Sequence, residues 1–120
     1  MDQDTDTQRD IMTAELAVER IMHTGLLTCT PHTPLCEAAA RMAERRCSSM
    51  LVMQGGQVVG IWTEHDSLFV DFADPEAVKR PIERVMSHPV ATIHSTTPAG
   101  EAALRFSAER RRHLLVVDDA

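Results

Sequence analysis

Two polar residues, Thr63 and Asp66, lie three positions apart directly after the apolar run 58–62. That run is short, β-branched and aromatic, which is typical of a buried strand. Thr63 followed by Asp66 predicts a helix capped by Thr63, so a hydroxyl, a carboxylate and backbone N–H groups meet there. The carboxylate can accept hydrogen bonds from sugar hydroxyls, while Thr63 and the helix terminus can donate to phosphate. Taken alone, the two residues favour capping over binding.

A second candidate is a run of three arginines, Arg110, Arg111 and Arg112, followed by His113. Arginine presents forked donors that suit phosphate, and histidine adds a donor whose charge changes near neutral pH. The alternative is that the arginines only complement the dipole at a helix end. We leave both interpretations open for Arg111 and favour phosphate contact for Arg112 and His113.

Other chemistry finds little support in the sequence. The six histidines and the three cysteines, Cys29, Cys36 and Cys47, show no zinc-like spacing and no CxxC pair. His65, Asp66 and Ser67 occupy consecutive helical positions, so their side chains diverge and cannot form a triad. We therefore expect no metal site, no catalytic residues and no enzymatic activity.

The composition sets further limits. The chain has 120 residues, 43% of them hydrophobic, with 12 Lys and Arg against 18 Asp and Glu, for a net charge of −6. Such an acidic chain is a poor partner for nucleic acid unless its basic residues cluster. It contains no apolar run long enough to span a membrane, and its first residues lack the basic region of a signal peptide. We expect a cytoplasmic protein with free thiols, without membrane insertion and without a nucleic-acid partner.

Periodicity and turn residues predict the elements that position these candidates. Gly55 and Gly56 mark a hairpin turn. Thr33 is the expected N-cap of a helix that has Pro34 in its first position. In chain order we expect a disordered leader over 1–10, a loosely helical segment over 11–22, a strand over 26–30, a helix over 34–46, strands over 49–53 and 58–62, a helix from 63 to about 72, a connector from Asp74, and a short helix from Pro81.

The chain also contains an internal duplication. Residues 18–56 align without a gap to residues 82–120, an offset of 64, and 13 of these 39 positions are identical. Within the second copy, the partners of Gly60, Thr63 and Asp66 would fall at 124, 127 and 130, beyond Ala120. We therefore expect the second repeat to lack its last strand and helix, as in a fragment of a longer protein or a truncated module.

These segments, in their order, spacing and repetition, resemble the CBS domain, named after cystathionine β-synthase. The resemblance rests on V-x-x-I-M (18–22), T-P-L-x-E-A-A (33–39), S-S-M-L-V (48–52) and V-V-G-I-W-T-E-H-D (58–66). It implies an α+β (α/β mixed) fold of two β-α-β-β-α repeats related by a pseudo-twofold axis, a pair known as a Bateman module. The expected domains are a leader over 1–10, a first repeat with its preceding helix and connector over 11–80, and an incomplete second repeat over 81–120.

The resemblance also implies a regulatory role. CBS pairs commonly bind AMP, ADP, ATP or S-adenosylmethionine in the cleft between repeats, signal to an attached domain and form homodimers. Here the output domain is expected beyond Ala120, and no cofactor is required. By position in the family motifs, Asp66 would bind the ribose, Thr63 the ribose or phosphate, and Arg112 and His113 the phosphates, while the base would lie against Thr28, Cys29, Thr30, Cys47, Ser48 and Ser49.

One alternative stays open within this family. The pair could serve only as a dimerisation or scaffold module without a nucleotide, with Asp66 as a helix cap and the arginines as a solvated surface or a patch that binds a partner. Finding Thr63 and Asp66 engaged with each other and no cleft beside them would favour the scaffold.

Overall fold

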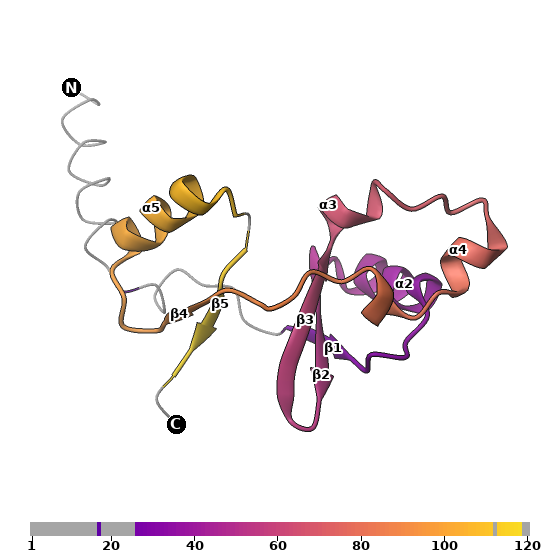
Figure 1. Ribbon diagram of the computed structural model, residues 1–120, viewed down its shortest axis with the longest axis horizontal. Coiled ribbons are helices and arrows are strands. Elements are labelled where there is room, and N and C mark those ends of the chain that lie inside the picture. The colour runs from indigo at the N-terminus through magenta and orange to yellow at the C-terminus, as the bar shows by residue number, and fades with distance from the viewer. Residues whose placement is uncertain (1–16, 18–25, 112, 119–120) are drawn as a thin grey trace. The chain divides into compact units, whose positions relative to one another are not determined.

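The computed structural model describes Ala17, residues 26–111 and residues 113–118 (Figure 1). The leader predicted over 1–10 lies outside the described residues, as does the helix predicted over 11–22 except for Ala17. Residues 24–90 form one compact unit, and residues 1–23 with 91–120 form another. We describe each unit by itself.

The first unit is built on a three-stranded sheet. Its strands lie in the order β1, β2, β3, with β1 parallel and β3 antiparallel to β2, so that Thr28 lies opposite Leu51 and Ser49 opposite Thr63. The turn between β2 and β3 contains Gly55 and Gly56 at φ of +60° and +77°, values that glycine adopts without strain. The predicted hairpin is thus confirmed. The strands are β1 (Leu27–Cys29), β2 (Ser49–Gln54) and β3 (Gln57–Thr63).

The long helix of this unit, α2 (Leu35–Arg45), buries Leu35, Ala38 and Met42. Their spacing places them on one face of the helix, as the sequence pattern predicts. The predicted N-cap was wrong by one residue. Pro34 is the cap, with the extended angles φ −65° and ψ 146°, and the Thr33 hydroxyl instead hydrogen-bonds the Thr30 hydroxyl, 3.1 Å between oxygens.

After the sheet the chain departs from prediction in two places. The helix after Thr63, α3 (Glu64–Ser67), ends well before residue 72. Leu68 and Phe69 are 76% and 81% exposed, so no apolar face extends the helix by packing. The segment predicted as a connector instead contains a short helix, α4 (Pro75–Lys79), whose first turn is capped by the Asp74 carboxylate.

The core of the first unit includes a segment that follows α4. Pro81 caps the 3₁₀ helix η2 (Ile82–Arg84), which confirms a short helix here. Ile82 is completely buried beside Trp62 and Met50, and its N–H donates to the Thr33 carbonyl at 2.8 Å. Ser87 exchanges two backbone hydrogen bonds with Ile61 of β3. Residues 81–90 therefore belong to the first compact unit, whereas the sequence division was placed after residue 80.

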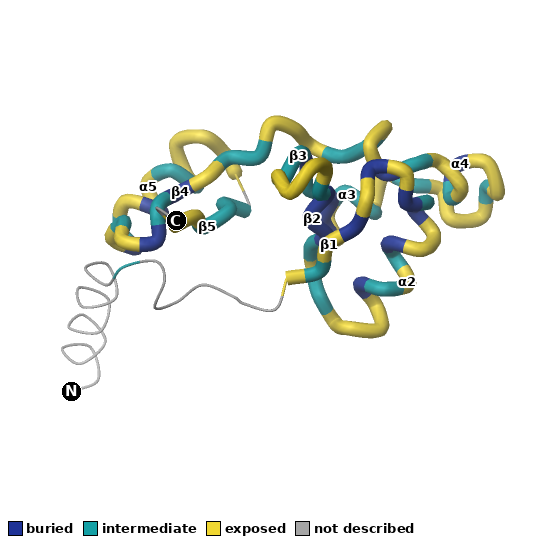
Figure 2. The backbone as a smooth tube through the Cα atoms, turned by 90° about the horizontal axis from the view of Figure 1, so that it is seen from below, coloured by how far each residue is buried: buried dark blue, intermediate teal, exposed yellow. Residues whose placement is uncertain are grey.

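The second unit repeats part of the first. It contains β4 (Thr92–His94), α5 (Ala99–Glu109) and β5 (Leu115–Val117), and its two strands are parallel. Thr92 lies opposite Leu115, which is the register of Thr28 and Leu51 shifted by 64 residues. Ile93 on β4 and Ala102 on α5 are buried. Figure 2 shows buried segments of the tube on both β4 and α5. A mixed α+β fold built from a duplicated β-α-β unit is confirmed.

Candidate functional site

Thr63 and Asp66 form a reciprocal hydrogen-bonded pair at the start of α3. The Asp66 Oδ2 atom accepts from the Thr63 backbone N–H at 2.8 Å and from the Thr63 hydroxyl at 3.0 Å. The Asp66 backbone N–H donates back to Thr63 Oγ1 at 3.3 Å. Thr63 is buried and Asp66 is half-buried. The predicted cap is confirmed, and it fixes the carboxylate in one orientation.

Cys47, Ser48 and Ser49 lie at the same end of the sheet. Ser49 is opposite Thr63 in the β2–β3 ladder, and the Ser48 carbonyl accepts from the Glu64 N–H at 2.8 Å. A concavity of about 410 Å³ opens here between α2 and the chain that follows β3. The residues that line it include Cys47, Ser48, Trp62, Glu64, Ser67 and Phe72. Thr63 and Asp66 are not among the residues that line this concavity, although their chain neighbours Trp62, Glu64 and Ser67 are.

Thr28, Cys29 and Thr30 lie toward the other end of the sheet. Cys29 is opposite Val52, which is opposite Gly60, three residues before Thr63 in β3. Three residues of strand correspond to roughly 10 Å. Within this unit, the three predicted base-contacting residues are thus not adjacent to Thr63 and Asp66. They line a separate concavity of about 590 Å³.

Cys29 has the environment of a core residue. Its side chain is 7% exposed and packs in the hydrophobic core of the first unit. Burial raises the pKa of the Cys29 thiol above its ordinary value, although a hydrogen bond with Thr33 and the charge of Arg41 oppose that rise. A buried, protonated thiol is a poor nucleophile.

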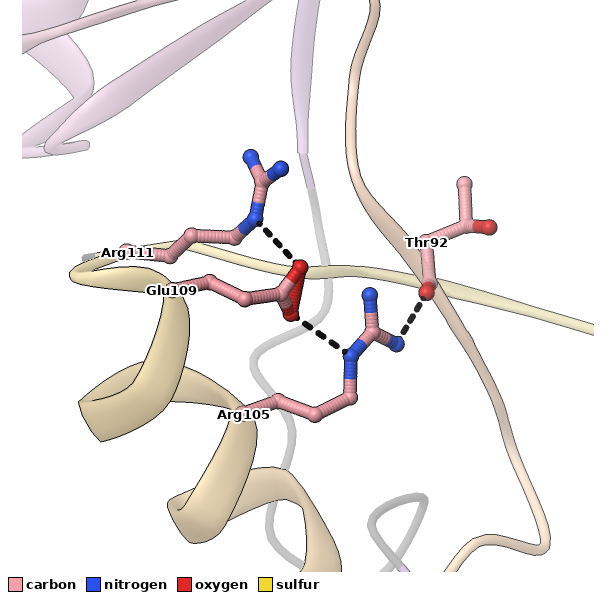
Figure 3. Close-up of polar contacts among 4 residues, drawn as sticks. All are labelled: Thr92, Arg105, Glu109 and Arg111. Carbon is pink, nitrogen blue, oxygen red and sulfur yellow. Dashed lines mark hydrogen bonds and ion pairs between the residues drawn. The ribbon is translucent and has the colours of Figure 1, made fainter.

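The predicted phosphate contacts belong to the second unit. Arg112 lies outside the described residues, and His113 is half-buried two residues before the start of β5. Their roles stay predictions. Arg111 lies beside Glu109, whose Oε1 accepts from Arg111 Nε at 3.2 Å (Figure 3).

Glu109 also binds Arg105, and sequence reasoning missed both residues. Its Oε2 accepts from Arg105 Nε at 3.0 Å, and Arg105 Nη1 donates to the Thr92 carbonyl at 2.6 Å (Figure 3). Hydrogen bonds from Arg105 and Arg111 lower the pKa of the Glu109 carboxyl. The four-residue spacing of Arg105 and Glu109 on one helix was the available signal for this pair.

The first repeat has the same arginine contact. Arg41, which is Arg105 minus 64, donates from Nη2 to the Thr28 carbonyl at 2.9 Å. Thr28 is likewise Thr92 minus 64. In each repeat a helix arginine therefore ties α2 or α5 to the strand before it. Arg41 and Arg105 are identical in the ungapped alignment, as are Thr28 and Thr92, and this identity was the available signal for the shared contact.

Two searches of the described part of the chain bear on other functions. Among these residues there is no group of three or more His, Cys, Asp or Glu side chains arranged to hold a metal ion. The helices described there include none with the length and apolarity needed to cross a membrane.

Comparisons with known proteins agree on one family. The family model of the CBS domain matches residues 18–66 and 82–120. A curated relative from Arabidopsis thaliana, the CBS domain-containing protein CBSCBSPB1, is 30% identical over 107 residues, which cover 88% of this chain and 20% of that protein. The chain thus spans about a fifth of that relative's length.

Solved structures give the same result. An uncharacterized conserved protein from Pyrococcus horikoshii superposes with a TM-score of 0.80 at 27% identity, covering 88% of this chain and 81% of the other. The CBS domain of a bacterial CNNM/CorC family Mg²⁺ transporter, solved in complex with ATP, gives a TM-score of 0.81 at 19% identity. That match covers 98% of this chain and 84% of the other, and it supports the fold.

Proposed function

This chain belongs to the CBS domain family, and from that premise we propose that it is a regulatory module that binds an adenosine-containing ligand and signals to an attached domain. The proposed ligands are AMP, ADP, ATP and S-adenosylmethionine. The observation that carries the proposal is the Thr63–Asp66 pair, a carboxylate and a hydroxyl that their mutual hydrogen bonds hold in place. The related CBS domain solved with ATP supports this ligand class.

The two carboxylate oxygens of Asp66 differ in their hydrogen bonds. Oδ2 serves the cap by accepting from the backbone and the hydroxyl of Thr63. Within the described part of the chain no donor contacts Oδ1, which leaves it available for a ribose hydroxyl. Because the cap already holds the carboxylate in place, a ligand would lose little side-chain entropy in binding it. Capping and ribose binding are therefore compatible.

The remaining proposed contacts follow from the positions of the other residues. Cys47, Ser48 and Ser49 are proposed to offer backbone and hydroxyl groups to the base. In support, Ser49 begins β2 opposite Thr63, and Cys47 and Ser48 directly precede it. Thr28, Cys29 and Thr30 are proposed base contacts through their backbone. Arg112 and His113, with Arg111 as an undecided third, are the proposed phosphate contacts. No cofactor is required by this function.

The scaffold alternative also has an observation in its favour. Leu68 and Phe69, just after α3, are largely exposed, and exposed apolar side chains of this size are typical of association surfaces. In that alternative Asp66 serves as a cap only, and the pair of repeats assembles as a homodimer without a nucleotide. A homodimer that also binds nucleotide is our preferred proposal, with the output domain C-terminal to Ala120.

The proposal is tested by Asp66→Ala. We expect the affinity for the adenosine ligand that binds wild type to fall by about tenfold or more, since a charged hydrogen-bond partner of the ribose is lost. Isothermal titration with AMP, ADP, ATP and S-adenosylmethionine measures it. Asp74→Ala is the matched control, because Asp74 also caps a helix of this unit through its carboxylate.

The control separates loss of a cap from loss of a ligand contact. Asp74→Ala removes a cap, at a cost of about 1 kcal/mol, and should leave nucleotide affinity unchanged. Equal affinity in wild type and Asp66→Ala would contradict the ribose contact. Absence of binding by all four ligands, together with a stable dimer in solution, would favour the scaffold.

A further inference from the structure

Residues 80–87, which we call the strap, are hydrogen-bonded to the first unit at two places. Near the start of the strap, the Ile82 N–H donates to the Thr33 carbonyl at 2.8 Å. At its end, Ser87 and Ile61 of β3 exchange backbone hydrogen bonds of 2.8 and 3.0 Å. The strap therefore ties the loop between β1 and α2 to β3.

The strap also packs on β3 at a position that has no side chain. Ile82 is completely buried in the core of the first unit, and Met86 packs against that core. A Cβ atom added at Gly60 would overlap with the Sδ and Cγ atoms of Met86. Left-handed backbone angles occur at Gly55 and Gly56 and are not what Gly60 provides. Glycine is required at position 60 because Met86 approaches the strand closely there.

Both docking places adjoin residues that are proposed to contact the ligand. Ile61 is two residues before Thr63 in β3. Thr33 donates from its backbone N–H to the Thr30 carbonyl at 3.1 Å, and the hydroxyls of these two threonines are hydrogen-bonded. The docked strap thus fixes the backbone next to Thr63 and next to Thr30. A ligand that contacts either residue would bind better when the strap is docked, since less disorder is lost in binding.

The strap leads directly into the second unit. Three residues, 88–90, separate Ser87 from Ala91. The Ala91 carbonyl accepts from the Leu115 N–H at the start of β5 at 2.9 Å. Ser87 is therefore anchored in the first unit and Ala91 in the second. Because so little backbone freedom lies between the two anchors, docking of Ser87 restricts the conformations open to the start of β4.

We infer that the strap is a coupling element between the two units, with Gly60 and Met86 as the residues that position it. In its first part the inference concerns the protein without ligand: a docked strap stabilises the pairing of β4 with β5. In its second part, which rests on the proposed function, a nucleotide bound to the first unit favours the docked strap and so stabilises the second unit. By linkage, undocking the strap weakens nucleotide binding by the same factor.

The first part is tested by hydrogen exchange in the full chain without ligand. Valine suits a strand but fills the space that Met86 occupies, so Gly60→Val should undock the end of the strap. Exchange of the Ser87 amide should become faster by about tenfold or more, and that of the Leu115 amide by about threefold or more. Val58→Ala, a substitution elsewhere in β3, is the control and should leave both rates unchanged.

A compensating substitution shows whether the space at Gly60 serves Met86. Met86→Ala removes about as many side-chain atoms as Gly60→Val adds, so the double variant keeps the packed volume. Its Ser87 and Leu115 exchange rates should return to within about twofold of wild type. Ser87→Pro applies if Gly60→Val does not fold. It removes the N–H that donates to Ile61, leaves β3 unsubstituted, and should speed Leu115 exchange to the same extent.

The second part is tested with AMP and ATP. A nucleotide that binds wild type should slow exchange of the Ser87 and Leu115 amides at saturation. Its affinity for Gly60→Val should be lower by the factor by which it slows Ser87 exchange in wild type, within about twofold, because the coupling is reciprocal. Isothermal titration measures that affinity, and the double variant with Met86→Ala should recover it.

The outcomes separate the two parts from each other and from the proposed function. Unchanged Leu115 exchange in both Gly60→Val and Ser87→Pro would overturn the coupling to β4. A double variant that exchanges as fast as Gly60→Val would overturn the role of Gly60 and Met86. A nucleotide that binds wild type and Gly60→Val equally would overturn the second part and leave the proposed function intact. Absence of binding by AMP and ATP would contradict the proposed function, and the ligand-free rates would still decide the first part.

Discussion

The backbones of the two repeats are more similar than their side chains are. Arg46 and Arg110 end their helices with almost the same left-handed angles, φ 53° and 54°. Arg41 and Arg105 donate to equivalent strand carbonyls. The parallel strands of both repeats have the same register, shifted by 64 residues. The duplicated part is therefore a β-α-β frame held by main-chain geometry and one arginine.

The packing around that frame differs. In the first unit the core contains Met50, Val52 and Trp62, with Ile82 added from η2. In the second unit the described hydrophobic cluster contains the small set Ile93 and Ala102 as buried residues, with half-buried neighbours such as Leu114. β3 and the segment 81–87 cover the first frame, which is why the same β-α-β pattern reaches deeper burial there. A shared frame thus leaves each copy free to differ in the depth of its core.

The largest expected effect comes from truncating the same position in each core. Met50 is completely buried, so Met50→Ala should lower the free energy of unfolding of the first unit by about 2–5 kcal/mol. Leu114, its partner 64 residues later, is half-buried, and Leu114→Ala should cost about 1 kcal/mol. Hydrogen exchange measured separately over residues 49–63 and 92–117 assigns each loss to its unit.

Each variant controls for the other, since both truncate an apolar side chain at equivalent places in the repeat. Equal losses would show that the second repeat has as deep a core as the first and would remove the contrast drawn above. A loss of protection in both units from Met50→Ala alone would show that the two units unfold together.

Local sequence signals predicted the parts of the fold that depend on neighbours in the chain. The hairpin at Gly55 and Gly56 follows from backbone freedom, and the Thr63–Asp66 cap follows from a three-residue spacing. The error at Thr33 has a local cause as well: its hydroxyl bonds Thr30, which precedes it, and so is not used to cap α2. Asp74 and Pro75 were read as a linker, although aspartate before proline is also a helix start.

The site depends on contacts that a linear pattern does not contain. The separation of Cys29 from Thr63 can be predicted only from the register of the three strands. A shift of that register by one residue moves a contact by about 3.3 Å. The bond from Arg41 to the Thr28 carbonyl likewise needs the packing of α2 on the sheet. The family resemblance supplied Ser48 and Ser49, which the structure places beside Thr63. It did not supply a role for Arg41 or Glu109.

A smaller difference between the repeats is expected in their stability at alkaline pH. Burial raises the pKa of the Cys29 thiol in the folded unit, whereas the equivalent residue of the second repeat, Ile93, does not titrate. The unfolded chain therefore loses this proton at a lower pH than the folded chain. The resulting contribution to stability is complete below the unfolded pKa and is lost as pH rises through the folded pKa. Stability of the first unit should therefore fall as the pH rises above the ordinary pKa of a cysteine thiol.

Cys29→Val tests this pH dependence, since valine keeps a buried side chain of similar size and removes the titrating thiol. Denaturation at several pH values should show a shallower alkaline decline for Cys29→Val than for wild type, and the decline should be confined to the first unit. Parallel profiles for the two proteins would mean that Cys29 does not contribute.

The smallest expected effect on stability is that of Glu109→Gln. Glu109 is the side chain whose polar contacts differ most between the second repeat and the first. Hydrogen bonds from Arg105 and Arg111 lower the pKa of Glu109, so its contribution is present above its ordinary pKa and is lost as pH falls through the folded pKa. The carboxylate is at the surface, where water and salt screen the pairing. Stability at neutral pH should therefore change within experimental error, and the decline of stability at acid pH should be slightly smaller in the variant.

The Arg105 Nε–H resonance should shift in the Glu109→Gln variant because that N–H loses a carboxylate acceptor. The amide resonances near Thr92 should stay in place if the arginine-to-carbonyl bond belongs to the shared frame, as its presence at Arg41 without a glutamate implies. Displaced Thr92 resonances, or a clear loss of stability, would instead show that the second repeat needs Glu109 to hold a contact that the first repeat makes unaided.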